Sequence, residues 1–372
     1  MEAKKLRLSE DKCFKIHICK KGTHCPQVLK VHEKDMKNAS EAIYLGDVIS
    51  ETGKVDATVL QRTQKATGII NQITSMLSSI CLGSFHFDIG LVLREAKLIN
   101  SIMVNSEVWH NAQLKHIQSL EKSDTDLLKN ILKAHAKTAN EAFYLELAVY
   151  PLRFNLAIRR FMYLWHILSR DKAELISKIY EAQKYEVNKG DWVRIMQEER
   201  EKYDVLESDD DISKISQERF RNIVKKKVYS YAVKYLHDMA SPHRKSDGLK
   251  NPLFEKQPYF SDRRFSREDV QLLFKLRTKM LDCKTNFGHE YANQLACRIC
   301  KDENTIEDED HILTCRELNE TEYDSKFSDV YGNTDKQYNV VKIFKQVRRR
   351  RQVFLDLAAK SSILIDCPDV TV

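Results

Sequence analysis

Apolar positions recur at two different spacings along the chain, and the spacing changes near residue 55. Before that point, the runs Cys13–Ile18 and Gln27–Val31 alternate polar with apolar residues, as half-buried strands do, and Lys20–Pro26 supplies a turn between them. A third short run, Ala42–Leu45, ends at a glycine. Three short strands bury too little apolar surface to be stable alone, so residues 1–55 are predicted to form the edge of a sheet.

From Asp56 onward, apolar residues recur every three or four positions, which is the pattern of amphipathic helices. In the first such segment, Ile70 and Ile73 share one face, and Arg62 and Lys65 are predicted to lie on the opposite face. Glycine and proline are scarce, at 10 and 6 residues, which favours long helices over a many-stranded sheet. Further helices are predicted at about 89–103, 111–134, 151–169, 171–184, 214–239 and 337–360.

Two polar stretches interrupt the helical pattern and are predicted as connections. Glu207–Asp211 is an acidic break and is interpreted as a solvated link. Residues 241–262 hold three of the chain's six prolines and are predicted as a linker. Ser266–Asp269 then matches a capping box, with aspartate in its last position. The chain is thus divided into a β segment over 1–55, a helical domain over 56–240, the linker 241–262, a basic helix with a Cys/His segment over 263–320, and a C-terminal helix over 337–360.

Four residues near the C-terminus have the spacing of a metal site, C-x2-C-x10-H-x3-C: Cys297, Cys300, His311 and Cys315. A tight turn presents the first two thiolates to one metal ion, and three intervening residues place His311 and Cys315 on one face of a helical turn. Three thiolates and one imidazole complete the tetrahedral shell of zinc and leave no position for water. A structural Zn²⁺ ion is therefore predicted.

Composition places the chain among soluble globular proteins, with 42% hydrophobic and 31% charged residues. No apolar run approaches the roughly 20 residues that cross a bilayer, and the N-terminus lacks the apolar core of a signal peptide. Nine cysteines without a secretory signal argue against a disulfide framework. A cytoplasmic or nuclear protein is expected, neither secreted nor transmembrane.

Charge is distributed unevenly around a net value of +7. Residues 342–351 carry six cations and no acid, whereas 301–320 carry eight acids and two cations. This segregation is compatible with nucleic-acid contact away from the acidic loop, and equally with a solvated helix face and a solvated loop. Two basic helices supply the candidate nucleic-acid-binding cations. The helix after the linker carries Lys275, Arg277 and Lys279, and the C-terminal helix carries Arg348, Arg349, Arg350 and Arg351.

Several segments, in the same order along the chain, resemble parts of non-LTR (LINE-type) retrotransposon reverse transcriptases. Leu8–Ile18 and Tyr44–Ser50 resemble the last palm motifs of that family, in which a Lys-Cys strand precedes the Tyr-Leu-Gly turn of the primer-grip hairpin. Arg94–Ile99 and Glu107–His110 resemble the helical thumb. Val270–Thr278 and the Cys/His segment resemble the C-terminal zinc segment.

The resemblance implies a mainly helical fragment of an RNA-directed DNA polymerase. Its parts would be a small N-terminal β-hairpin or sheet remnant, a thumb-like helical bundle and a C-terminal zinc segment of CCHC type. Tyr44, Leu45 and Gly46 would lie near the primer end. Arg62 and Lys65 would follow the backbone of a template–primer duplex, with a solvated helix face as the alternative. RNA or DNA would be the partner.

The resemblance also implies what such a polymerase needs. The family holds two metal ions on three palm carboxylates, two of which come from a Tyr-x-Asp-Asp hairpin. The sequence contains no Tyr-x-Asp-Asp motif, and Asp209–Asp211 is interpreted as part of the solvated link. No catalytic residue is therefore predicted, and the chain alone is expected to be inactive as a polymerase. The alternative function is a host-retained module whose zinc segment and basic helices bind another protein.

Overall fold

The structure is a computed structural model that describes residues 13–18, 28–31, 34–80, 85–110, 112–187, 191–205, 207–241, 248–291, 294–319 and 325–365. The side chains of 288–291 and 358–365 are not part of this description. The first residues of the resemblance, Leu8–Lys12, and the turn predicted at Lys20–Pro26 lie outside the described residues.

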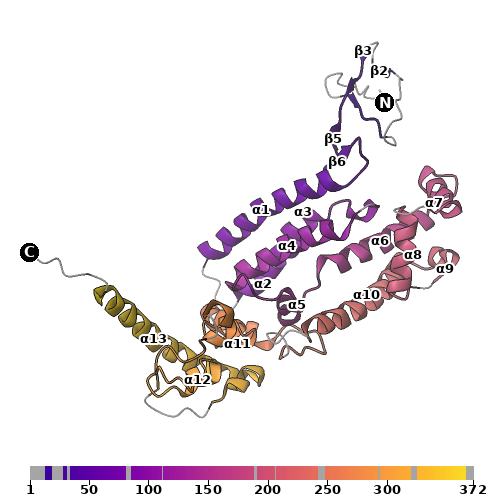
Figure 1. Cartoon of the computed structure of the whole chain (residues 1–372). Helices are drawn as coiled ribbons and strands as arrows, with labels where there is room; N and C mark the ends of the chain where they lie inside the picture. Colours follow the sequence, from indigo (N-terminus) through magenta and orange to yellow (C-terminus); the bar gives the residue numbers. More distant parts are fainter. Residues whose placement is uncertain are drawn as a thin grey trace, which may run out of the picture. The chain divides into compact units, whose positions relative to one another are not determined.

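The described chain is mainly helical, with its named strands near the N-terminus (Figure 1), which confirms the predicted fold class. The strands are β1 (Phe14–Lys15), β2 (Lys30–Val31), β3 (Lys34–Asp35), β4 (Lys37–Asn38), β5 (Glu41–Tyr44) and β6 (Asp47–Ser50). The α-helices are α1 (Asp56–Ser79), α2 (His86–Leu93), α3 (Asn100–Ile102), α4 (Leu114–Leu132), α5 (Asn140–Leu147), α6 (Leu152–Leu168), α7 (Leu175–Tyr185), α8 (Trp192–Lys202), α9 (Asp209–Lys214), α10 (Gln217–Ala240), α11 (Arg267–Arg277), α12 (Glu309–Thr314) and α13 (Thr334–Ile365). A π-helical stretch (Arg94–Ile99) and short 3-10 helices (Ser106–Val108, Pro258–Phe260, Lys284–Tyr291, Phe327–Tyr331) lie between them.

The chain forms two compact units that are each discontinuous in sequence. Unit 1 combines Met1–Ile73, Val92–Asp126 and Tyr150–Ala232, and unit 2 combines Thr74–Leu91, Leu127–Val149 and Val233–Val372. The helices α1, α2, α4 and α10 each contribute residues to both units. The units differ from the predicted linear division, because several stretches within 56–240 belong with the Cys/His segment.

The best-formed strand pair of unit 1 is the antiparallel hairpin β5–β6, in which Tyr44 pairs with Asp47. Leu45 and Gly46 make the turn with positive φ angles of 49° and 88°, as a tight two-residue hairpin requires. Arg62 of α1 donates to the Asp47 carboxylate at 2.8 Å and so ties the hairpin to the helix. The other strands pair as β1 with β4 and β2 with β3, so the described N-terminal strands form separate two-stranded pairs.

Side chains that are distant in sequence hold unit 1 together. Arg94 lies in the π-helical stretch and is 1% exposed. It donates to both carboxylate oxygens of Asp124, at 2.6 and 2.7 Å. Trp192 donates its indole N–H to the Glu107 carbonyl at 2.8 Å. These contacts bring α4 to the π-helical stretch and α8 to the short 3-10 helix Ser106–Val108.

Unit 2 is built around a buried glutamate of α5. Glu146 accepts two N–H groups from Arg277 of α11, at 2.9 and 2.8 Å, and the hydroxyl of Tyr259 at 2.6 Å. Aromatic rings surround this pair, and Phe143 and Phe274 stack with their centroids 5.3 Å apart. The buried pair and the rings join α5 to α11, the helix that precedes the Cys/His segment.

Two predicted connections differ from the structure. Asp209–Lys214 forms α9, because Ser208 caps the helix by accepting the Asp211 amide at 3.1 Å, and acidic side chains suit a helix N-terminus. Within the linker predicted at 241–262, Leu249 is 2% and Phe260 is 0% exposed, so apolar burial packs the described part into unit 2. Residues 242–247 of that linker lie outside the described residues.

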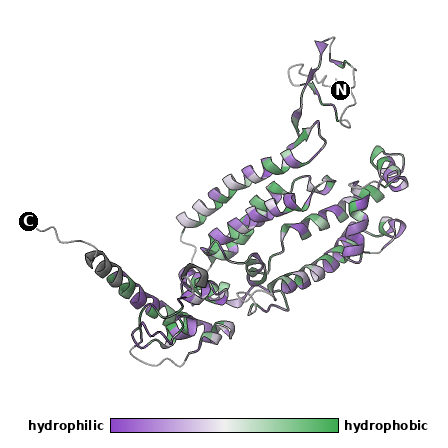
Figure 2. Ribbon diagram, in the orientation of Figure 1, coloured by the Kyte–Doolittle hydropathy of each residue, from purple (hydrophilic) through white to green (hydrophobic). Residues whose placement is uncertain are grey.

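The capping box of α11 is confirmed. Ser266 Oγ accepts the Asp269 amide at 3.2 Å, and the Asp269 carboxylate accepts the Ser266 amide at 2.9 Å. Leu273 and Leu276 of this helix are both 0% exposed. Figure 2 shows apolar and polar residues mixed along the long helices, and among the described helices none combines the length and apolarity that crossing a membrane requires.

Candidate metal centre

A short hairpin presents the first two cysteines of the Cys/His group. The N–H of Cys297 donates to the Thr305 carbonyl across the hairpin at 3.1 Å. Lys301 has a positive φ of 57°, and its N–H returns to the Cys297 carbonyl at 3.0 Å. This tight turn brings the thiol of Cys300 close to that of Cys297.

Helix α12 presents the other two ligands. Asp308 caps the helix by accepting the His311 amide at 2.7 Å. Cys315 directly follows the last helical residue. Because His311 and Cys315 are four positions apart, one turn of helix places the imidazole and the thiol on the same face.

The four side chains converge on one point. One sulfur or nitrogen atom from each of Cys297, Cys300, His311 and Cys315 lies within 4.8 Å of all the others. Cys300 Sγ lies 3.5 Å from His311 Nε2. In a tetrahedral zinc site, bonds of about 2.0–2.3 Å separate the ligand atoms by about 3.5–3.8 Å. The structure therefore brings the four predicted ligands together as a group that can hold a metal ion.

Burial controls the protonation of these thiols. Cys297 is 3% and Cys315 is 1% exposed. Burial, followed by the neighbouring Cys297 thiol, raises the pKa of Cys315 to about 12, and burial also raises the pKa of Cys297. Both groups are therefore thiols at neutral pH, and a metal ion must displace their protons to bind.

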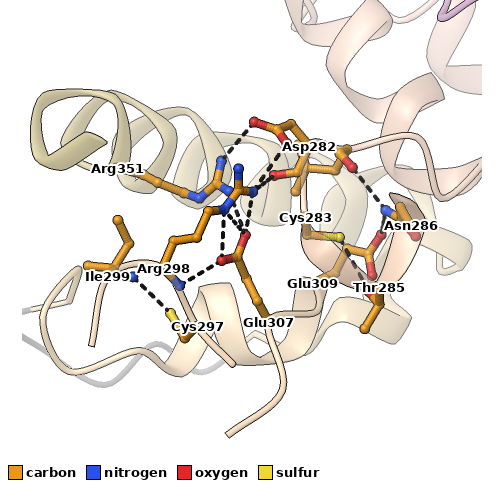
Figure 3. A network of polar contacts seen from close by, with 11 residues as sticks. Asp282, Cys283, Thr285, Asn286, Cys297, Arg298, Ile299, Glu307, Glu309 and Arg351 are labelled. Carbon is orange, nitrogen blue, oxygen red and sulfur yellow. Dashed lines mark hydrogen bonds and ion pairs between the residues drawn. The ribbon is translucent and has the colours of Figure 1, made fainter. Parts of the chain in front are cut away.

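We call the hairpin formed by residues 295–307 the metal hairpin. An ion-pair cluster joins it to α13 (Figure 3). We call it the Glu307 cluster, and it consists of Glu307, Arg298, Arg351 and Asp282. Glu307 is 0% exposed and accepts the Arg298 side chain at 2.5 and 3.0 Å and that of Arg351 at 2.6 Å. Asp282 lies 3.1 Å from Arg298 and 3.5 Å from Arg351. Burial opposes ionisation of Glu307, but the two arginines outweigh it and hold its pKa below the usual value.

Carboxylates of the acidic loop that precedes His311 accept hydrogen bonds from neighbouring residues. Asp308 caps α12, and Glu307 is part of the cluster above. Glu309 is 6% exposed and accepts the Asn286 side-chain amide at 2.6 Å. A solvated loop was one of two alternatives for this acidic segment, and three of its carboxylates instead stabilise the hairpin and its neighbours.

Three of the cations predicted to contact nucleic acid are buried in ion pairs, which corrects that prediction. Arg62 is 3% exposed and bound to Asp47. Arg277 is 3% exposed and bound to the buried glutamate of α5, and Arg351 is 7% exposed within the Glu307 cluster. A guanidinium that is buried against a carboxylate has no free face for a phosphate, so these three arginines are structural.

The other predicted cations lie nearer the surface of their units. Lys65, Arg348 and Arg349 are exposed, and Lys275, Lys279 and Arg350 are half-buried. Arg350 donates to the Leu318 carbonyl at 3.0 Å. Arg348 and Arg349 form no ion pair with any residue that the structure describes. These two side chains are available to a partner.

The Tyr-Leu-Gly segment lies at the tip of the β5–β6 hairpin. Tyr44 is 64% and Leu45 is 76% exposed, and the Leu45 carbonyl accepts the Asn105 side-chain amide at 3.2 Å. Gly46 supplies the left-handed turn. Contact of this hairpin with a primer end stays a prediction.

Sequence reasoning missed Arg298 and Glu307, the residues that couple the metal hairpin to the rest of unit 2. Arg298 lies between the two cysteines of the turn, and Glu307 lies on the facing arm, where its N–H donates to the Leu295 carbonyl at 2.8 Å. The opposite charges of Arg298, at the predicted tight turn, and Glu307, a few residues after it, were the available signal.

The chain was compared with known proteins by family, by sequence and by structure. No family model, no curated protein and no solved structure matches it.

Proposed function

We propose that this chain binds nucleic acid and that its Cys/His group holds a structural Zn²⁺ ion, on the plan of the C-terminal part of a non-LTR retrotransposon reverse transcriptase. The observation that carries the proposal is the coupling of α13 to the metal hairpin. Arg351 is fixed in the Glu307 cluster, while Arg348 and Arg349 on the same helix are exposed and unpaired among the described residues. Guanidinium groups on an ordered helix, without competing carboxylates, suit a phosphate backbone.

Zinc is the metal that this donor set favours. Three thiolates and one imidazole are typical of structural zinc sites, and hard cations such as Mg²⁺ prefer oxygen ligands. Four protein ligands complete a tetrahedral shell and leave no position for a water molecule. The ion would therefore hold the hairpin against α12 and would supply no nucleophile.

The metal proposal is tested by the zinc content of purified variants. The wild-type chain should contain about one zinc ion, and Cys315→Ser should lose most of it, because three ligands form an incomplete shell. Cys283→Ala is the matched control, since Cys283 is buried near the site but lies outside the ligand group. Equal zinc content in Cys315→Ser and Cys283→Ala would refute the assignment.

The nucleic-acid proposal is tested by the salt dependence of binding. The affinity for labelled single-stranded and duplex oligonucleotides should fall linearly in a plot of log affinity against log salt, because phosphate contacts release counterions. An absence of salt-dependent binding would refute the proposal and favour the alternative, a protein-interaction module.

The proposal assigns no reaction to the chain, because the sequence has no Tyr-x-Asp-Asp motif to hold the two metal ions of a polymerase. Primer extension by the purified chain would contradict this part of the proposal.

A further inference from the structure

Unit 2 contains a cleft of about 350 Å³ whose charged lining, among the described residues, is cationic. Lys129 and Lys133 line it from the end of α4, and Arg267 lines it from the start of α11. None of the three forms an ion pair with a described residue. We call this the first basic cleft.

Polar atoms without partners occur in the lining of this cleft. His86 is 1% exposed, and its Nε2 atom is buried without a hydrogen-bond partner among the described residues. Thr74 Oγ1 and Arg267 Nε are likewise buried without a hydrogen-bond partner among the described residues. Buried polar atoms are normally satisfied. Arg267 Nε and Thr74 Oγ1 can each donate a hydrogen bond, and beside the unpaired cations these two atoms point to an anionic ligand.

A second cleft, of about 490 Å³, shares Lys133 with the first. Lys275 of α11 and Arg348 of α13 also line it, and neither forms an ion pair with a described residue. Asp282 is the carboxylate in its described lining, and it is neutralised within the Glu307 cluster. We call this the second basic cleft.

The cations of the two clefts lie close enough to repel one another. Burial, followed by the charges of Arg348 and Lys133, lowers the pKa of Lys275. Burial, followed by the charges of Arg267 and Lys133, lowers the pKa of His86 to about 4. Lys133 takes part in both effects, which fits its place in both linings. Repulsion between these cations destabilises the protein when no anion is bound, and bound anions would relieve this repulsion.

We infer that the two basic clefts together bind consecutive phosphates of one nucleic-acid strand, with Lys133 as the shared contact between them. This inference rests on the proposed function and names its site. A single small anion would occupy part of one cleft and leave the cations of the other uncompensated, whereas a strand delivers a phosphate to each. Phosphate contacts carry no base information, so binding here should be independent of sequence.

The test compares two double variants that remove the same charge. Lys133→Gln with Lys275→Gln neutralises the clefts, and Lys250→Gln with Lys336→Gln neutralises two exposed lysines of unit 2 outside both linings. Each phosphate contact contributes about 0.7–0.9 to the slope of log affinity against log salt. The cleft variant should therefore lose about 1.4–1.8 from the wild-type slope, and the control should keep that slope.

The outcomes separate the inference from the proposed function. Equal slopes for the cleft variant and the control, with a steep slope for the wild type, would overturn the inference and leave the proposed function standing. No salt-dependent binding by the wild type would overturn both. Arg348→Gln changes one exposed side chain of α13, so it repeats the test of the second cleft if the double variant has a lowered melting temperature.

A further comparison distinguishes a strand from a single phosphate group. Oligonucleotides with a 5′-phosphate and with a 5′-hydroxyl should bind equally, because internal phosphates fill the clefts. A strong preference for the 5′-phosphate, or displacement by inorganic phosphate at the concentration of the oligonucleotide, would overturn the strand assignment.

Discussion

Buried arginines are the side chains on which each unit depends most directly. Arg94 is paired with Asp124 in unit 1, and Arg277 with Glu146 in unit 2, and each of these side chains is at most 4% exposed. Breaking such a pair leaves one charge buried without compensation. The sequence did not reveal these pairs, because the partners are far apart in the chain and nothing in the local pattern separates a buried arginine from a solvated one.

Replacing Arg277 should therefore destabilise the protein strongly. Arg277→Met leaves the buried Glu146 unpaired and should lower the free energy of unfolding by about 3–5 kcal/mol. Lys336→Gln removes an exposed ion pair with Asp329 and should change it by less than about 1 kcal/mol. Urea denaturation followed by circular dichroism measures both. Similar losses in the two variants would contradict the structural role of Arg277.

His86 should make the stability of unit 2 depend on pH. Its pKa is about 4 in the folded chain against an ordinary 6.5, so between these values the unfolded chain binds a proton that the folded chain does not. Stability should therefore fall as the pH drops from 6.5 towards 4, and this contribution should be constant above 6.5.

The variant His86→Gln tests this dependence. Its unfolding free energy should fall less steeply than that of the wild type between about pH 7 and pH 5, because the group that titrates is gone. The exposed Ser119 supplies a control without a titratable group, and Ser119→Ala should keep the wild-type slope. Parallel curves for wild type and His86→Gln would rule the effect out.

Amphipathic helices are the elements that the sequence predicted best, since a three-to-four-residue repeat needs no knowledge of neighbours. α6 and α10 lie within a few residues of the predicted ranges, and α1 begins at the predicted Asp56. α5 escaped prediction because it is buried on nearly all sides and carries no polar stripe. α9 escaped because its aspartates look like a solvated break. The grouping of Cys297, Cys300, His311 and Cys315 was predictable from spacing alone, whereas the Glu307 cluster depends on where α13 lies in space.

The N-terminal cap of α11 should contribute measurably to the free energy of unfolding. Ser266→Ala removes the acceptor of the Asp269 amide and should cost about 1 kcal/mol of unfolding free energy. Ser119→Ala, in the exposed middle of α4, should be neutral or slightly stabilising, because alanine is the better helix former. Chemical denaturation of the two variants provides the comparison, and a neutral Ser266→Ala would mean that the capping box adds nothing.

Across the whole molecule, the division into two units means that the Cys/His segment shares a core with helices from the middle of the chain. Unit 2 contains most of α2 and all of α5, which lie far upstream in the chain, together with α11 and α13. Loss of a metal ion from the Cys/His group should therefore lower the local stability of unit 2. The linear arrangement of predicted domains did not show this, because contact between distant segments is invisible in local patterns.

Chelation tests the extent of that coupling. Removing the metal should increase amide exchange over residues 294–319 and in α13 near Arg351, and leave α6 and α8 of unit 1 protected. Hydrogen exchange followed by mass spectrometry, with and without chelator, reads both units in one experiment. A rise in exchange throughout unit 1 would show that the two units do not unfold separately.

The Glu307 cluster also sets the boundary of the smallest piece of chain that can carry an intact metal site. The four ligands end at Cys315, yet the carboxylate beneath them is neutralised by Arg351, far along α13. A recombinant fragment trimmed to the ligands would bury Glu307 beside Arg298 alone. The shortest fragment that keeps the Glu307 cluster therefore runs from before Asp282 to beyond Arg351. A deletion that removes Arg351 but spares every cysteine is expected to weaken the Cys/His group.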